Sequence, residues 1–267
     1  MLTVQNYVKA ESLEQAWELN QKKSNRIIGG MLWMRMGNLR AQTAIDLSGL
    51  GLDGIEETEE EFRIGCMVTL RQLEEHVGLA AYTDGALKEA LRHIVGVQFR
   101  NLATVGGSIF GRFGFSDVLT IFLAMDTYVE LYKGGVMPLV EFAAAPRDRD
   151  ILVRVIVKKH PAAFVYQSVR SASTDFPVLT CAAAKYTDGQ WRFAVGARPG
   201  RAVLLTDEKH MLNEGAAAAK KFGAFAAKQI ATGSNIRGSA EYRTHLTEVL
   251  VTRSIEKLCA GGVKDAD

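Results

Sequence analysis

The amino-acid sequence predicts an α+β fold, because short strand-like stretches alternate with helix-like stretches along its whole length. Apolar residues make up 48% of the 267 residues and charged residues 23%, which are the proportions of an ordinary folded protein. A chain of this length buries enough apolar surface to fold without a metal ion or a disulfide. We expect one large domain or two small ones, with a boundary near residue 160 that separates residues 1–160 from residues 161–267.

The first half of the chain is expected to contain helices that begin at residues able to cap a helix N-terminus. These helices cover residues 12–23, 69–76, 84–95 and 116–125, with Ser12, Thr69, Asp84 and Ser116 as their caps. Gln15 and Gln72 complete capping boxes at the first two. Strands are expected at 26–28, 61–68, 128–132 and 151–157. The stretch 101–115 is rich in Gly and Ser, so we predict an irregular loop there.

The second half of the chain is expected to combine a hairpin with two helices. Strands are predicted at 164–169, 178–185 and 191–195, and Asp188-Gly189 is a strong hairpin signal between the last two. An Ala-rich helix is predicted over 214–228, and a longer helix over 240–258 has apolar residues at helical spacing.

Charge and composition exclude several classes of function. Lys and Arg number 32 while Asp and Glu number 30, a balance too even for a protein whose main partner is a nucleic acid. No stretch reaches the ~18 apolar residues of a membrane span, and no secretory signal is apparent, so we expect a cytoplasmic protein. Cys66, Cys181 and Cys259 are scattered singly and are too few to hold a typical iron–sulfur cluster, so any cluster is expected on a partner chain.

Two glycine pairs mark places where the backbone can approach a ligand closely. Gly29-Gly30 follows a predicted strand, and Gly106-Gly107 follows Ala103-Thr104-Val105. Because glycine has no Cβ, successive backbone amides can form a concave anion site, although such pairs are more often ordinary turns. Neither pair matches a Rossmann or P-loop motif. Two such loops that face each other would be able to bind a pyrophosphate.

The dipeptide Ser116-Asp117 also has two interpretations. Asp117 lies ten positions after Gly107, and its carboxylate is suited to accept hydrogen bonds from a ribose diol. By spacing alone, the simpler interpretation is that the two residues cap the following helix.

Three segments together resemble the FAD-binding medium subunit of the molybdenum hydroxylases, the group that includes xanthine dehydrogenase and carbon monoxide dehydrogenase. Residues 98–117, QFRNLATVGGSIFGRFGFSD, look like the second flavin-contact segment of this family. Residues 26–36, RIIGGMLWMRM, resemble its first flavin loop, and residues 236–246, IRGSAEYRTHL, its C-terminal domain signature. The segments occur in the family's order and cover nearly the whole chain. The resemblance implies a PCMH-type FAD-binding domain of two subdomains, followed by a small α+β C-terminal domain.

The resemblance also implies which residues contact a non-covalent FAD. At the first pyrophosphate loop these are Ile28, Gly29, Gly30, Met31 and Leu32. At the second they are Thr104, Gly106, Gly107 and Ser108, followed by Ser116 and the ribose-side acid Asp117. Ile94 matches a position over the isoalloxazine, and the flavin end is completed by Arg170, Asp175 and Leu179, with Val178 as the alternative to Leu179.

The sequence departs from the family pattern at three places. The usual Thr-Asp of the first loop is Met31-Leu32 here, so the side-chain hydrogen bonds of that loop are lost. This loss is tolerable if the phosphates are held mostly by backbone amides. Ser108 replaces the usual Asn, but its hydroxyl still provides a hydrogen-bond donor. Gly114 replaces a Pro, and this change is expected to loosen the loop.

The resemblance implies an electron-transfer subunit rather than a chain that contains the substrate pocket. Electrons from a molybdenum cofactor on one partner chain would pass through iron–sulfur clusters on another to FAD, and then to NAD or another acceptor. The amino-acid sequences of these two flavin-contact segments most resemble those of xanthine dehydrogenase-type members. Two alternatives remain open. One is a flavin-free assembly subunit, which Met31-Leu32 favours; the other is a free-standing FAD-dependent NADH reductase.

Overall fold

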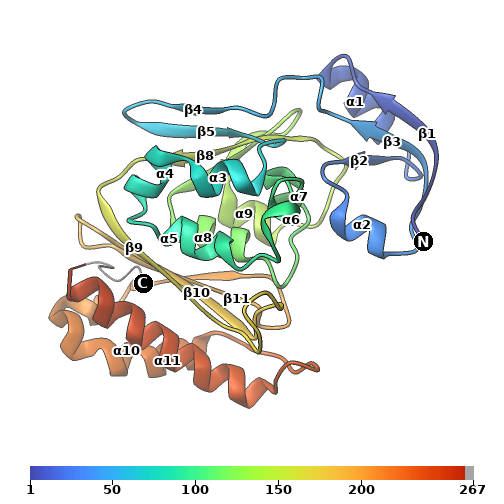
Figure 1. Ribbon diagram of the computed structural model, residues 1–267. Coiled ribbons are helices and arrows are strands. Elements are labelled where there is room, and N and C mark those ends of the chain that lie inside the picture. The colour runs from blue at the N-terminus through green and yellow to red at the C-terminus, as the bar shows by residue number, and fades with distance from the viewer. Residues whose placement is uncertain (262–267) are drawn as a thin grey trace.

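The computed structural model describes residues 1–261, and its first part is a three-stranded parallel sheet (Figure 1). The strand order is β1-β3-β2, with β1 at Thr3–Lys9, β3 at Arg40–Asp46 and β2 at Arg26–Ile28. Parallel neighbours need crossover connections, and α1 (Leu13–Asn20) and α2 (Leu32–Met36) provide them. Gly29 and Gly30 therefore lie at the end of β2, in the connection that leads to α2.

The second sheet is antiparallel and has the order β4-β5-β8-β6-β7. Its strands are Ile55–Glu57, Glu61–Gly65, Leu152–Lys158, Thr127–Leu131 and Gly135–Pro138. Helices fill the space between this sheet and the third sheet (Figure 1). They are α3 (Leu70–Glu75), α4 (Val77–Tyr82), α5 (Ala86–Arg92), α6 (Val97–Arg100), α7 (Val105–Phe110), α8 (Asp117–Ala124) and α9 (Leu139–Ala144).

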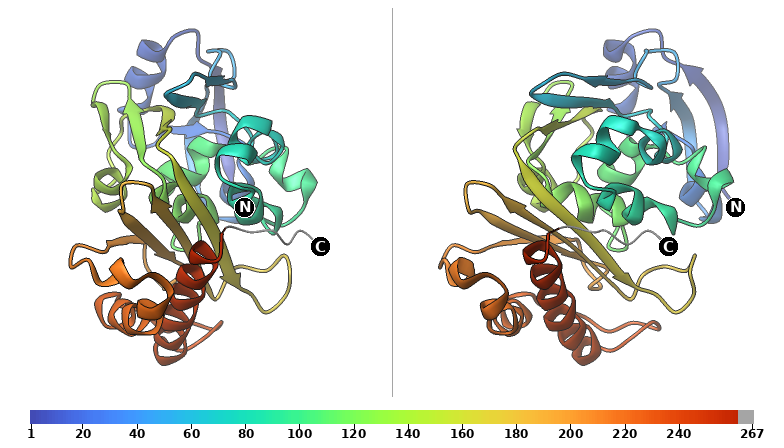
Figure 2. Two further views of the ribbon diagram at one scale, coloured as in Figure 1. Left: turned by 90° about the vertical axis from the view of Figure 1, so that its left-hand side faces the viewer. Right: turned by 60° about the vertical axis from the view of Figure 1, so that its left-hand side comes forward.

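The third sheet is an antiparallel meander of β9 (Ala162–Val169), β10 (Leu179–Tyr186), β11 (Trp191–Gly196) and β12 (Val203–Thr206). A 3₁₀ segment (Met211–Ala218) leads into α10 (Ala219–Gln229), and α11 (Ala240–Cys259) follows. Figure 2 shows α10 and α11 together on one face of this sheet, with the remainder of the protein on the other.

Two hydrophobic cores meet at the third sheet. The larger core is formed by residues of the first sheet, the second sheet and the helices beside them, together with Phe164, Tyr166 and Ala182 of the third sheet. The smaller core joins the opposite face of that sheet to α10 and α11. Helix α8 has every residue buried, which places it at the centre of the larger core. The domain boundary near residue 160 stays a prediction, since the third sheet contributes to both cores.

Most of the predicted elements are present in the structure. Ser12, Thr69 and Ser116 cap their helices as predicted, each accepting a hydrogen bond from a backbone N–H three residues later. The Asp188-Gly189 hairpin joins β10 to β11, and Gly189 adopts a left-handed conformation there with φ of 90°. Strands β1, β3, β4, β7 and β12 and helices α2, α4, α6 and α9 were not predicted.

Three local predictions were wrong. Asp84 does not cap α5: it has φ of 53°, and the N-cap is Gly85. The stretch 101–115 is not an irregular loop, because it contains α7, whose N-cap Thr104 accepts a hydrogen bond from the Gly107 amide. The predicted helix 214–228 is interrupted at Gly215, where φ is 59° and ψ is −127°.

The capping box before α3 can be tested directly. The Thr69 Oγ1 accepts from the Gln72 amide at 3.2 Å, and the Gln72 Oε1 accepts from the Thr69 amide at 2.8 Å. We expect Thr69→Ala to lower the free energy of unfolding by about 1 kcal/mol, because two helix-end donors lose their geometry. Urea unfolding measures this change. Ser171→Ala, at an exposed position, is the control, and an equal effect of both substitutions would contradict the role of the cap.

Candidate functional site

A cavity of about 810 Å³ lies where the first sheet, α7 and the third sheet come together. Its walls are the β2–α2 connection, α7, the segment that leads into β8, and the β9–β10 connection. It contains fourteen of the fifteen residues singled out from the sequence: Ile28, Gly29, Gly30, Met31, Leu32, Ile94, Thr104, Gly106, Gly107, Ser108, Ser116, Asp117, Arg170 and Asp175. Their contact with a flavin stays a prediction, but the fold brings them together around one space.

Leu179 is the exception. It is the first residue of β10, is fully buried, and belongs to the core beneath α10 and α11 rather than to the cavity wall. The alternative, Val178, is buried in the same core. The residues of this segment that reach the cavity are Phe176 and Pro177, just before the strand begins. Contact of this segment with a flavin stays a prediction.

The first glycine pair is explained by a close crossing of two backbone segments. A Cβ on Gly30 would overlap the carbonyl oxygen of Leu102, and a Cβ on Gly29 would lie 2.5 Å from the Thr104 Oγ1. Gly106 is restricted in the same way, because its Cβ would lie 2.7 Å from the carbonyl oxygen of Cys66. Glycine is therefore needed for packing at Gly29, Gly30 and Gly106, apart from any role at the cavity.

The two glycine pairs differ in the hydrogen-bonding groups that they offer to a ligand. The amides of Val105, Gly106 and Gly107 donate to Val68, Cys66 and the Thr104 side chain, so they are already used within the protein. Within residues 1–261, by contrast, no acceptor is found for the consecutive amides of residues 29–34. The second pair starts a helix, and its amides are used within the protein, so contact of Gly106 and Gly107 with a flavin stays a prediction.

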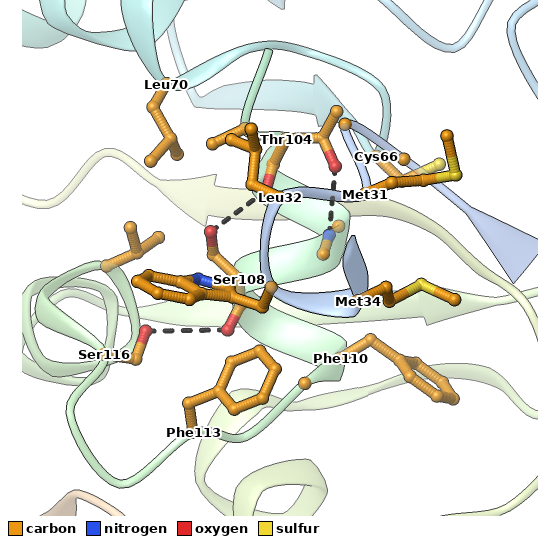
Figure 3. Close-up of a pocket in the computed structure, with 18 of the residues that line it drawn as sticks. Met31, Leu32, Met34, Cys66, Leu70, Thr104, Ser108, Phe110, Phe113 and Ser116 are labelled. Carbon is orange, nitrogen blue, oxygen red and sulfur yellow. Dashed lines mark hydrogen bonds between the residues drawn. The ribbon is translucent and has the colours of Figure 1, made fainter. Parts of the chain in front are cut away.

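Met31 shapes the first loop through its backbone. It has φ of 56° and ψ of 12°, a left-handed conformation that is uncommon for residues other than glycine, asparagine and aspartate. Left-handed residues next to right-handed ones orient successive amides toward one concave point, which suits an anion. Figure 3 shows Met31, Leu32 and Met34 beside Thr104 and Ser108 of the α7 region. The loop thus offers main-chain donors surrounded by apolar side chains.

Asp117 is a buried carboxylate with two side-chain partners. Its Oδ1 accepts hydrogen bonds from the Tyr166 hydroxyl and the Arg170 guanidinium. Burial raises the pKa of Asp117 to about 6, although both partners favour its charged form. Both bonds go to Oδ1, so Oδ2 is the oxygen that remains for a ligand in the cavity. Ser116 caps α8 as the simpler interpretation predicted, and it lines the cavity as well.

Arg170 connects this acid to the β9–β10 connection. Its NH1 donates to the Asp175 carbonyl at 2.6 Å, and its Nε donates to the Ser168 hydroxyl at 3.2 Å. Asp175 in turn pairs with Arg237 at 2.9 Å, which holds the pKa of that carboxyl below its usual value. Arg237 was not predicted as a site residue, although it lies in the C-terminal segment 236–246 that carries the family resemblance.

Aromatic side chains form a large part of the wall, and sequence reasoning missed them. They are Trp33, Phe99, Phe110, Phe113, Phe115 and Phe176. The Phe-rich run at 110–115 was the available signal, but an isolated aromatic residue is more often part of a core than of a binding site. Here they are only partly buried, so their exposed faces remain available to a ligand.

The other departures from the family pattern also have structural explanations. The Ser108 hydroxyl donates to the Thr104 carbonyl at 3.0 Å, and the Ser108 carbonyl accepts from Ser116 at 3.5 Å (Figure 3). The expectation that Gly114 loosens its loop is wrong. Its carbonyl accepts from the Ala197 amide at 2.8 Å, and a Cβ at Gly114 would lie 3.0 Å from the Gly200 carbonyl oxygen, so this loop is packed against the third sheet.

The described residues contain no cluster of His, Cys, Asp and Glu side chains suited to hold a metal ion. Cys66 lines the cavity, and burial raises the pKa of its thiol to about 12, so it is a thiol rather than a thiolate at neutral pH. Among residues 1–261, no helix has both the length and the apolar character needed to cross a membrane.

Comparisons with known sequences identify a family for the N-terminal part. A profile of the family described as FAD binding domain in molybdopterin dehydrogenase matches residues 2–159, more than half of the chain. YgfM of Escherichia coli K12 is 27% identical over 252 residues, which cover 93% of this chain and 94% of that protein. The nicotine 6-hydroxylase medium subunit of Paenarthrobacter nicotinovorans is 28% identical over 275 residues, with coverage of 93% and 95%.

Comparisons with solved structures extend the match to nearly the whole chain and confirm the α+β fold. A chain of quinoline 2-oxidoreductase from Pseudomonas putida 86 superposes with a TM-score of 0.83 at 20% identity, covering 96% of this chain and 97% of that chain. A chain of the Cu,Mo-CO dehydrogenase gives a TM-score of 0.82 at 21% identity, with coverage of 97% and 99%.

The buried carboxyl of Asp117 leads to a prediction about pH. Because its pKa is raised from 3.8 to about 6 on folding, the folded protein binds the proton more tightly than the unfolded chain. Its contribution to the free energy of unfolding is therefore present below pH 4 and is lost as the pH rises toward 6. The loss is at most about 3 kcal/mol. We expect Asp117→Asn to remove this component, measured by urea unfolding between pH 4 and 7.

The exposed Asp53→Asn is the matched control for this experiment, because it removes a carboxyl without changing a buried one. A constant difference between Asp117→Asn and the wild type across the whole pH range would contradict the raised pKa.

Proposed function

The chain belongs to the family of FAD-binding domains in molybdopterin dehydrogenases, as an oxidoreductase subunit of the molybdenum hydroxylase type, and from this premise we propose that it transfers electrons through FAD from partner chains to a separate acceptor. The observation that carries the proposal is the run of unpartnered amides at residues 29–34, which opens on a cavity of about 810 Å³. Such a run is suited to phosphate oxygens, and the cavity volume is that of a cofactor site.

The residues around the cavity fit the different parts of FAD. The backbone of Gly29, Gly30 and Met31 would bind the pyrophosphate, because main-chain donors do not depend on side-chain identity. Asp117 would accept from a ribose hydroxyl through its remaining oxygen, while Tyr166 and Arg170 hold the carboxyl in place. The apolar and aromatic wall suits the planar rings of the cofactor. No covalent attachment to the chain is proposed.

The protein's task in this proposal is to bind, orient and shield the cofactor. When bound, flavin supplies the redox chemistry, since it accepts single electrons and can release a pair as hydride. The chain itself needs no nucleophile or general acid, and Cys66, the thiol in the cavity wall, is kept protonated by burial. NAD or another oxidant is the proposed acceptor.

The proposed partners are a chain with the molybdenum cofactor and a chain with iron–sulfur clusters. The name of the nicotine 6-hydroxylase medium subunit supports a place as the middle subunit of such a complex. We propose a xanthine dehydrogenase-type complex because the sequences of residues 26–36 and 98–117 most resemble those of xanthine dehydrogenase-type members. The hydroxylated substrate would be recognised on the molybdenum chain.

The second candidate, a flavin-free assembly subunit, is favoured by Met31-Leu32, which removes side-chain hydrogen bonds from the first loop. Purification of the chain, followed by visible absorption spectroscopy and chromatography of the released cofactor, separates the two. Stoichiometric FAD, either retained or bound on reconstitution, supports the electron-transfer proposal. A colourless chain that binds no FAD in excess, yet still associates with its partners, supports the assembly role.

The phosphate site in the first loop can be tested with a matched pair of variants. Aspartate and asparagine both tolerate the left-handed conformation of Met31, and they differ mainly in charge. We expect Met31→Asp to weaken FAD binding at least about tenfold through repulsion of the phosphates, whereas Met31→Asn binds within about threefold of the wild type. Titration of flavin fluorescence measures both. Equal affinity of the two variants would show that the phosphates lie elsewhere.

A further inference from the structure

The segment between the first glycine pair and β3 is attached to the remainder of the protein in an unusual way. We define residues 31–39 as the lid; none of them is buried, and Met36 is 78% exposed. The hydrogen bonds described for residues 31–37 are internal, from Arg35 to Met31 and from Gly37 to Met34. At the end of the lid, next to β3, the Asn38 side chain accepts from the Met1 amino group and the Leu39 carbonyl accepts from the Thr3 amide, and these two bonds join the lid to the N-terminal strand of the first sheet.

The main inward contact of the lid is the Trp33 side chain. Its ring centroid lies 5.3 Å from that of Phe99, 5.3 Å from that of Phe115 and 5.1 Å from that of Phe176. These phenylalanines come from α6, from the α7–α8 connection and from the β9–β10 connection, and all line the cavity. One side chain therefore connects the exposed lid to three separate walls.

The surface that receives Trp33 is organised without it. Phe115 stacks on Phe113 with centroids 5.2 Å apart, and it meets the edge of Phe176 at 4.5 Å. Behind Phe176, the Arg237 guanidinium lies 4.8 Å from the ring centroid and is fixed by Asp175. The receiving side is thus built by packing and an ion pair, whereas the lid contributes a single ring.

We propose that the lid opens and closes over the cavity, and that Trp33 is the latch that holds it shut on the bound cofactor. The inference rests on the proposed function for the identity of the cofactor, but the opening itself concerns this chain alone. Segments with few buried contacts and few hydrogen bonds to their surroundings open locally at low cost. Gly37, where an added Cβ would meet only the Met34 carbonyl oxygen at 3.7 Å, supplies backbone freedom for such a movement.

The latch predicts a kinetic effect on cofactor release. Three aromatic pairs are lost in Trp33→Ala, so we expect FAD to dissociate about tenfold to a hundredfold faster, while Trp33→Phe stays within about threefold of the wild type. Dilution of the FAD-loaded chain, followed by flavin fluorescence, measures the rate. Trp17→Ala is the control, because Trp17 is partly buried but lies outside the cavity wall. Equal release from Trp33→Ala and the wild type would overturn the proposal.

Opening can also be measured without the cofactor, through the exposed Arg35 in α2. Proteolysis needs an extended segment and Arg35 lies in a helix, so we expect opening of the lid to speed tryptic cleavage after Arg35, with mass spectrometry identifying the site. In the cofactor-free chain we expect faster cleavage there for Trp33→Ala than for the wild type, rescue by Trp33→Phe, and protection of the wild type by added FAD. If Trp33→Ala does not fold, Trp33→Leu replaces it, with circular dichroism as the check.

The two measurements separate the failure of this inference from that of the proposed function. A chain that binds no FAD, but whose cleavage at Arg35 depends on Trp33, contradicts the proposed function and leaves the lid in place. A chain that binds FAD, but is cleaved at Arg35 at the same rate in every variant, overturns the lid.

Discussion

The architecture of the site depends on a close approach of two backbones that only glycine permits. Gly30 lies directly against the carbonyl of Leu102, and Gly29 lies against the cap residue Thr104 of α7. This crossing fixes the three-stranded sheet to the helical layer, and it places the first loop beside the start of α7. Gly106 makes a similar close approach, to the backbone carbonyl of Cys66. The cavity is the space left beside this crossing, so the glycines that define the packing also define where a ligand can enter.

A second link, electrostatic rather than steric, ties the C-terminal part to the same space. Arg170 of the β9–β10 connection reaches Asp117 at the start of α8, and burial makes that pair costly unless every remaining donor is used. The Arg170 side chain meets this demand by also donating to Asp175 and Ser168. The connection is consequently held over the cavity, and Phe176 is presented to it. The structure uses the same acid as a helix-start residue, an ion-pair partner and a wall of the cavity.

The sequence predicted what depends on local chemistry and missed what depends on tertiary packing. Caps such as Ser12, Thr69 and Ser116 are readable because each satisfies backbone donors within its own turn. Helix α7 was missed because its glycines have low helix propensity, and because the contact that requires glycine at position 106 involves Cys66, a residue forty positions away. The exposed strand β1 offers no alternation of apolar residues to read. Fourteen positions named through the family resemblance line one cavity, whereas periodicity alone would have left both glycine pairs as turns.

The replacement of the usual Thr-Asp by Met31-Leu32 removes side-chain hydrogen bonds but leaves the backbone amides of the loop unchanged. The amides of residues 29–34 have no acceptor within residues 1–261 and belong to a loop that lines the cavity, so the donors proposed for a ligand are main-chain groups that do not depend on the side chains at 31 and 32. Side chains at 31 and 32 are then free to change as long as the loop keeps its path. A loop that gives up polar side chains also gives up enthalpic attachment to a ligand, and something else must keep it closed. In the proposed lid, the contact of Trp33 with three rings meets that need, so one aromatic side chain can hold an apolar loop closed.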